Sequence, residues 1–312
     1  MRINGPIDAA RWRQLRVGFA LLLPAGTIMV LMLALPFLAL VLLSFWRQSG
    51  FDIDPTLTAE NYIRIFAPSD QPTVWNGIPF YLAYPVPLIL LFKSLMMALT
   101  ATLAVILLAY PMAYFIAFRI RRGKAVWILL LTIPFWTSYL LRVFSWKVVL
   151  GYNGAINSGL VALGIIDKPL DFLLYTSGAV TVTLAHSWVA FAVMPIYVSL
   201  EKIDRNLLDA ASDLGDSRWQ RFRRITWPLS LPGTIAATLM VFIPTVGDYV
   251  TPTLVGGPSG TMIGNLIQDM FLKRNNAPMG AAVAIVMMAV IGLLALLVLW
   301  ASGFRRLRAR LK

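Results

Sequence analysis

Few side chains in this sequence could carry out covalent or metal chemistry. The 312 residues contain no cysteine and a single histidine, His186. Thiol catalysis, disulfides and cysteine-based metal sites are therefore excluded, and one histidine cannot hold a metal ion by itself. We expect His186 to form a hydrogen bond between helices, and we predict no catalytic residue and no metal site.

Asp248 is the acidic side chain best placed to bind a charged ligand. It follows an apolar run and stands beside Tyr249 and Thr251, and the glycines and prolines after it favour a break in the helix. A carboxylate near aromatic rings suits a cationic amine, because charge pairing and cation–π attraction each contribute roughly 0.5–2 kcal/mol when partly desolvated. Two alternatives stay open: Asp248 caps the adjacent turn, or it pairs with Arg142.

Aromatic side chains near the ends of apolar runs could line a path for such a ligand. The candidates are Trp136, Tyr139, Trp146 and Trp188. Aromatic rings also anchor helices at membrane interfaces, so this structural role is the alternative for each of them. A fixed positive charge in the path would repel a cation, and we therefore expect Arg142 to face an acidic partner or to reach the membrane surface.

One polar segment, residues 201–228, separates two long apolar runs. Its first half carries apolar residues at helical spacing and predicts a short amphipathic helix, which Gly215 ends. Asp216 or Ser217 can cap a second helix. Trp219, Phe222 and Ile225 lie on one side of that helix, and Pro228 and Pro232 are expected to stop it. The segment therefore predicts a helix–turn–helix outside the bilayer.

The rest of the chain is that of a polytopic membrane protein. Hydrophobic residues make up 59% of the sequence and occur in long runs. We predict one all-α membrane domain, residues 1–312, with spans at about 17–46, 92–118, 125–147, 172–200, 229–250 and 277–303. The first run is much longer than the apolar core of a signal peptide, so we expect an uncleaved span.

The loops differ in length and composition. Residues 47–91 are predicted to be a long, irregular external loop with one short helix near Thr58–Ile65, capped by Thr58. A second external segment, residues 148–171, favours a short interfacial helix around Ala155–Ile166. Residues 246–260 are rich in glycine and proline and predict an external turn.

The net charge of +13 could suggest nucleic acid, but its distribution indicates a membrane protein. Of the 27 Lys and Arg residues, 19 lie in the N-terminal segment, the loop after the second span, the polar segment and the C-terminal tail. Basic residues gather in cytoplasmic loops of membrane proteins. We therefore expect both termini and the polar segment to be cytoplasmic, and we expect no nucleic-acid partner.

The polar segment resembles the EAA loop of ABC-importer permeases. Asp209, Ala210, Ala211, Gly215, Ile225 and Pro228 stand at the spacing of that motif, with Asp209 in place of Glu and Trp227 in place of Leu. In the family this loop inserts into a groove on an ATPase subunit. The resemblance implies an ATPase-coupling role for these residues and for Trp219 and Phe222, in the permease fold of type I importers.

Three further stretches resemble the spermidine/putrescine "B"-type permeases of bacterial polyamine importers. They are residues 131–150, 152–160 and 241–267. The resemblance implies a bacterial inner membrane, a second homologous permease, two ATPase subunits that use ATP and Mg²⁺, and an external substrate-binding protein. This chain has no G-x-x-x-x-G-K-[ST] motif, so we expect it to bind no cofactor itself.

Other functions stay open at this stage. Relatives of this branch carry opines and other small amino compounds, so another amine is the first alternative substrate. A stand-alone secondary transporter would show repeated halves and charged relays within its spans, and this sequence shows neither. A membrane enzyme would need a nucleophile and a base, and most carboxylates lie in predicted loops.

Overall fold

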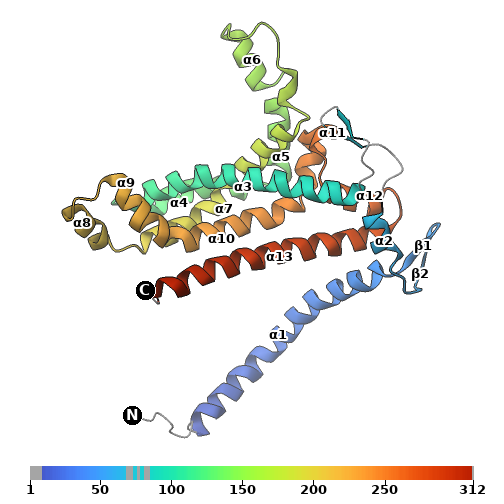
Figure 1. Ribbon diagram of the computed structural model, residues 1–312, viewed down its shortest axis with the longest axis horizontal. Coiled ribbons are helices and arrows are strands. Elements are labelled where there is room, and N and C mark those ends of the chain that lie inside the picture. Colours follow the sequence, from blue (N-terminus) through green and yellow to red (C-terminus); the bar gives the residue numbers. More distant parts are fainter. Residues whose placement is uncertain (1–8, 68–72, 76–77, 81–84, 311–312) are drawn as a thin grey trace.

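The computed structural model of the chain describes residues 9–67, 73–75, 78–80 and 85–310 (Figure 1). Helices make up most of it, which confirms the predicted all-α fold. The predictions for the start of the basic N-terminus, for parts of the loop 47–91 and for the last two residues lie outside the described residues.

Within the described residues, five helices are long and apolar enough to cross a membrane, and a sixth crossing results if one bent helix pair counts as a span. The five are α1 (Ala9–Ser44), α3 (Val86–Phe118), α7 (Ser177–Glu201), a helix that ends with α10 (Trp227–Val246), and α13 (Ala277–Arg310). Which residues of each helix lie within the bilayer stays a prediction.

The core lies where α3, α7 and α10 pack side by side (Figure 1). Small apolar residues fill the contact, among them Ala109, Val193, Ala237 and Val241. The backbones of α7 and α10 approach so closely at Gly233 that an added Cβ would lie 2.2 Å from the carbonyl oxygen of Pro195. A buried hydrogen bond of 2.8 Å joins Tyr110 Oη to Ser230 Oγ. Small residues allow such close packing of membrane helices.

Helix α1 lies at the margin of this arrangement. It approaches α13 at the end that carries α2 and diverges from it toward the other end (Figure 1). None of its most apolar 18-residue window is buried. Its apolar surface must therefore be covered by lipid or by another protein.

The predicted span 125–147 is divided into two helices by a sharp break. α4 (Lys124–Thr132) continues into the 3-10 turn η1 (Ile133–Trp136), and the chain is extended at Thr137 before α5 (Tyr139–Leu150) begins. The helices on either side of this break form an angle of 84°. Pro134 explains the break, because it removes a backbone donor from the helix. α6 (Ala155–Ala162) follows within the range predicted for a short helix, and the turn η2 (Asp171–Leu173) precedes α7.

Pro228 and Pro232 do not stop a helix, contrary to the prediction. α9 (Arg218–Arg221) runs through the π-helical turn η3 (Phe222–Thr226) into α10 without a break. In this turn the backbone N–H of Trp227 donates to the carbonyl of Phe222, five residues earlier. The wider π turn accommodates the missing donor of Pro228, which lies in the first turn of α10.

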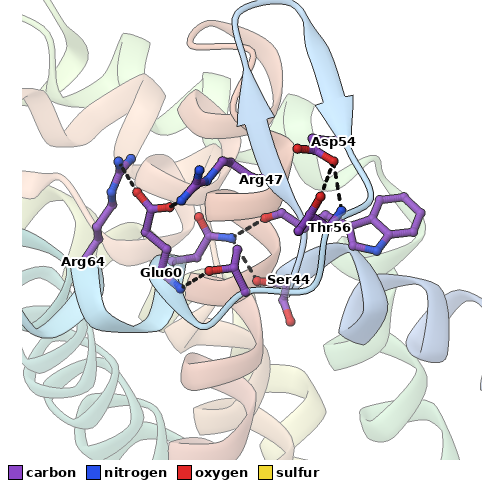
Figure 2. A network of polar contacts seen from close by, with 9 residues as sticks. Ser44, Arg47, Asp54, Thr56, Glu60 and Arg64 are labelled. Carbon is purple, nitrogen blue, oxygen red and sulfur yellow. Dashed lines mark hydrogen bonds and ion pairs between the residues drawn. The ribbon is translucent and has the colours of Figure 1, made fainter.

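The loop 47–91 is more regular than predicted. β1 (Arg47–Ser49) pairs antiparallel with β2 (Asp52–Asp54), and β3 (Thr73–Trp75) pairs with β4 (Ile78–Phe80). The helix α2 (Glu60–Phe66) lies where the short helix was predicted, and Thr58 Oγ1 accepts the backbone N–H of Glu60 at 3.1 Å. Figure 2 shows Glu60 held between Arg47 and Arg64. The side chain of Asn61 donates to the carbonyls of Ser44 and Trp46, which ties this loop to the end of α1.

The predicted glycine- and proline-rich turn is mostly helical. After a short break at residues 247–249 the chain forms the π turn η4 (Pro252–Gly256), α11 (Gly257–Gly260) and α12 (Ile263–Leu272). Gly257 has φ +55°, a value that glycine adopts at low cost, and the backbone there lies against Tyr175. Ser94 Oγ on α3 accepts the backbone N–H of Ile263 at 2.7 Å and holds the start of α12.

Candidate functional site

The polar segment forms two short helices at one end of the three-helix core (Figure 1). Asp204 begins α8 (Arg205–Asp213) by accepting the N–H of Asn206. Gly215 has φ +85° and reverses the chain, as the sequence predicts. Ser217 and Gln220 form a reciprocal capping box at the start of α9, so Ser217 is the cap and Asp216 instead pairs with Arg224 at 2.8 Å.

The eight residues predicted to couple to an ATPase divide into an exposed set and an anchoring set. Asp209, Ala210, Gly215, Trp219 and Pro228 are exposed, Phe222 and Ile225 are half-buried, and Ala211 is buried. Trp219 is 69% exposed, so most of its ring is accessible to a partner. The exposed set therefore offers a contact surface, and the other three residues hold it in place.

Phe222 is the anchor of this segment. Its ring stacks on Trp219 at 5.4 Å and meets Tyr110 edge-on at 5.9 Å. Tyr114 lies 6.4 Å away on the same helix, α3. Sequence reasoning missed the two tyrosines, and their four-residue spacing within α3 is the signal that could have found them.

Charged contacts fix the segment to the end of α3. Lys124 pairs with Glu201 at 2.7 Å and also donates to the carbonyl of Ala117 at 3.0 Å. Arg205 donates to that same carbonyl at 3.3 Å. Cations are favourable at the C-terminal end of a helix, where carbonyls lack intrahelical partners. These contacts therefore tie the segment to the end of α3 and the start of α4.

Asp248 lies in the break after α10, at the opposite end of the core. Its Oδ1 accepts the N–H of Val250 at 2.9 Å, so it caps the following turn as one alternative predicted. Its Oδ2 accepts the hydroxyl of Tyr139 at 2.6 Å, and that hydroxyl also lies 2.7 Å from Thr251 Oγ1. Thr251 is fully buried. One carboxylate thus joins the start of α5 to the break after α10.

A cavity of about 350 Å³ opens beside this carboxylate, and we call it the Asp248 cavity. Its lining comprises Phe135, Thr137, Tyr139, Arg142, Ser187, Trp188, Phe191, Pro244 and Asp248. Aromatic rings, one carboxylate and the Arg142 guanidinium make up much of the wall. The rings and the carboxylate suit an ammonium group, whereas the guanidinium opposes its binding. Sequence reasoning missed Phe135 and Phe191, whose rings pack edge-on at 4.1 Å.

Arg142 lines the same cavity without pairing with Asp248. Its guanidinium donates to the carbonyls of Ser187 at 3.0 Å and Thr137 at 3.3 Å, and it lies 4.7 Å from the centre of the Phe135 ring. No ion pair within the described residues involves Arg142, so the expected acidic partner is wrong. The two backbone carbonyls and the Phe135 ring contact the guanidinium instead of a carboxylate.

The structure brings together four of the seven predicted path residues. Asp248, Tyr139 and Trp188 line the cavity, and Thr251 lies behind them. Trp136 is 77% exposed, and Tyr249 lines a separate cavity of about 320 Å³ beside Phe271 and Met287. His186 faces the ring of Trp146 at 5.4 Å; it forms none of the expected hydrogen bonds within the described residues.

Comparisons with known proteins agree on one family. A family model described as "Binding-protein-dependent transport system inner membrane component" matches residues 9–307. The spermidine/putrescine transport system permease protein PotB of Escherichia coli is 38% identical over 276 residues, covering 88% of this chain and 94% of the relative. Its namesake in Haemophilus influenzae is 33% identical, covering 85% of this chain and 87% of the relative.

A solved structure is similar in fold. The crystal structure of a bacterial ABC transporter involved in the import of the acidic polysaccharide alginate contains a chain that superposes with a TM-score of 0.63. The alignment covers 94% of this chain and 98% of that chain at 18% identity. At this identity the likeness establishes the architecture and leaves the substrate open.

Proposed function

The chain belongs to the family of binding-protein-dependent transport system inner membrane components, and from this premise we propose that its importer carries polyamines such as spermidine and putrescine. As a member it is the inner-membrane permease subunit of an ABC importer and is not an enzyme. ATP hydrolysis belongs to a separate subunit. Because the chain belongs to this family, the alternative functions of a stand-alone transporter and of a membrane enzyme are set aside.

The Asp248 cavity is the observation that carries the substrate proposal. It combines a carboxylate with the rings of Tyr139, Trp188 and Phe135. A polyamine presents ammonium groups on an apolar chain, and such a wall matches both features. The relatives named for spermidine and putrescine support the same substrate class.

We propose that the polar segment is the surface on which an ATPase subunit docks. Asp209, Ala210, Gly215, Trp219 and Pro228 form the exposed part of that surface. ATP binding would draw the two polar segments of a permease pair together and switch the spans from inward-facing to outward-facing. ATP provides the difference in stability between the two states, without which no shift in population follows.

The proposed assembly contains a second homologous permease, two ATPase subunits and an external substrate-binding protein. We place the polar segment and both termini in the cytoplasm. The distribution of Lys and Arg supports this orientation. The start of α1 and the end of α13 also lie at the end of the molecule that carries α8 (Figure 1).

A second candidate substrate is another small amino compound that also carries a carboxylate, such as an opine. Arg142 lines the same cavity as Asp248, and its Nε has no hydrogen-bond partner within the described residues. A guanidinium and a carboxylate in one cavity could hold the two charges of a zwitterion. If deletion of this chain leaves polyamine uptake unchanged in the test below, this second candidate is favoured.

Uptake by the source cells tests the proposal. Deletion of this chain should abolish the uptake of labelled spermidine and putrescine, and the intact gene should restore it. The Asp209→Lys variant should reach the membrane but fail to restore uptake. Unchanged polyamine uptake in the deletion strain would contradict the assigned substrate.

A further inference from the structure

The hydroxyl of Tyr139 occupies the position in which a ligand would meet Asp248. It donates to Oδ2 at 2.6 Å, while Oδ1 is engaged by the N–H of Val250. Both Tyr139 and Asp248 line the Asp248 cavity. An ammonium group can therefore bind this carboxylate fully only if the tyrosine hydroxyl moves aside.

The same hydroxyl joins two elements that are far apart in the sequence. Tyr139 is the first residue of α5, directly after the break that follows η1. Asp248 lies in the break after α10, and Thr251 begins the turn that leads into η4. In addition to these polar contacts, buried Val143 of α5 and Val255 of η4 belong to one apolar cluster. The hydroxyl thus acts as a polar link between α5 and the segment after α10.

Resting on the function proposed above, we propose that the ammonium group of the transported amine displaces the Tyr139 hydroxyl from Asp248 and thereby weakens the polar link between α5 and the segment after α10 to the single contact with Thr251. The exchange favours a cation, because hydrogen bonds between two charged groups are stronger than those from a neutral hydroxyl. Thr251 Oγ1 lies 2.7 Å from the hydroxyl and can accept its hydrogen bond after the exchange. The displaced group is therefore not left without a partner.

This role makes Tyr139 a specificity-determining residue. Displacement requires an N–H donor as well as a positive charge. A primary or secondary ammonium provides both, whereas a quaternary ammonium provides the charge alone. The permease should therefore discriminate between spermidine and its N-permethylated, quaternary analogue, and this discrimination should depend on the Tyr139 hydroxyl.

The test uses the complete importer in lipid nanodiscs and compares wild type with Tyr139→Phe, which keeps the ring and removes the hydroxyl. We expect Tyr139→Phe to raise amine-free ATPase activity and to bind labelled spermidine on the order of tenfold more tightly, the factor that corresponds to one hydrogen bond to a charged group. The quaternary analogue does not displace the hydroxyl, so its binding should change little, and the preference for spermidine should therefore rise by a similar factor. Tyr249→Phe is the matched control. Tyr249 lines the separate cavity beside Phe271 and Met287, so this variant should behave as wild type.

The outcomes separate this proposal from the assigned substrate. Wild-type values for Tyr139→Phe in both ATPase activity and amine discrimination would overturn the displacement. If neither protein binds spermidine, the polyamine assignment fails, and the amine-free ATPase activity of Tyr139→Phe still decides whether the link restrains α5. An equal effect of Tyr249→Phe would also overturn the proposal, because the effect would then not depend on the hydroxyl at Asp248.

Discussion

At the scale of single residues, the closest helix contact depends on a glycine. An added Cβ at Gly233 would lie 2.2 Å from the carbonyl oxygen of Pro195 and 2.5 Å from Ser199 Cβ. Neither the backbone oxygen nor the Cβ can move without moving α7. Gly292 on α13 differs, because nothing lies within 4 Å of an added Cβ there.

Gly233→Ala should therefore destabilise the protein by roughly 1–3 kcal/mol, the usual range for overpacking a tight contact. Gly292→Ala should be neutral or stabilising by up to about 1 kcal/mol, because alanine favours a helix more than glycine does. The unfolding temperatures of the two purified variants and of wild type in detergent measure both changes in stability. Equal unfolding temperatures for the two variants would contradict the close contact at Gly233.

The carboxylate of Glu60 gives the loop after α1 a dependence on pH. Its hydrogen bond from Arg47 lowers its pKa below the ordinary value of 4.5. A lowered native pKa means that Glu60 stabilises the folded loop above about pH 4.5 and that this contribution is lost as the pH falls through the native pKa. Asn61 and Ser44 hold the same loop without a charge.

Wild type should therefore unfold at a higher temperature than Glu60→Gln at pH 7, and the difference should shrink below about pH 4.5. The effect should be small, because both arginines are exposed to solvent and Glu60 is only partly buried. A series of thermal unfolding curves between pH 7 and pH 3 measures it. A difference that stays constant across this range would show that Glu60 does not act through its charge.

At the scale of elements, the turn between α8 and α9 decides how the polar segment is presented. Gly215 has φ +85°, and proline cannot adopt a positive φ. Asparagine tolerates this region far better than other residues with a side chain. Proline and asparagine at position 215 therefore differ mainly in whether the backbone can keep the shape of the turn.

Gly215→Pro should abolish transport and ATPase stimulation while the protein still inserts into the membrane. Gly215→Asn should keep most of the activity, because the turn keeps its shape. Uptake assays on membranes with matched protein levels provide the comparison. Normal uptake by Gly215→Pro would contradict a coupling role for this turn.

Sequence patterns predicted some of these elements and missed others for physical reasons. The glycine turn, the Ser217 cap and the apolar runs follow from local rules that a single stretch of sequence contains. The continuation through Pro228 was missed because the π turn before it accommodates its missing backbone N–H. The cavity needed tertiary structure, since Tyr139 and Asp248 are 109 residues apart in sequence.

At the scale of the whole molecule, two distant features define the permease. The polar segment is held to α3 by Phe222, Lys124 and Arg205, and the Asp248 cavity lies at the other end of the core. Close packing of α3, α7 and α10 links the two. Packed helices shift as units, so movement at one end can change access at the other.

The most direct test of this account is ATP-driven uptake of labelled spermidine into liposomes that contain the complete importer. We expect wild type to accumulate spermidine, and we expect Asp248→Asn to lose at least about tenfold in uptake, because it removes the charge and keeps the size. The Trp136→Phe control should transport normally, since Trp136 lies outside the cavity and is 77% exposed. Undiminished spermidine uptake by Asp248→Asn would contradict the central claim that this carboxylate receives the amine.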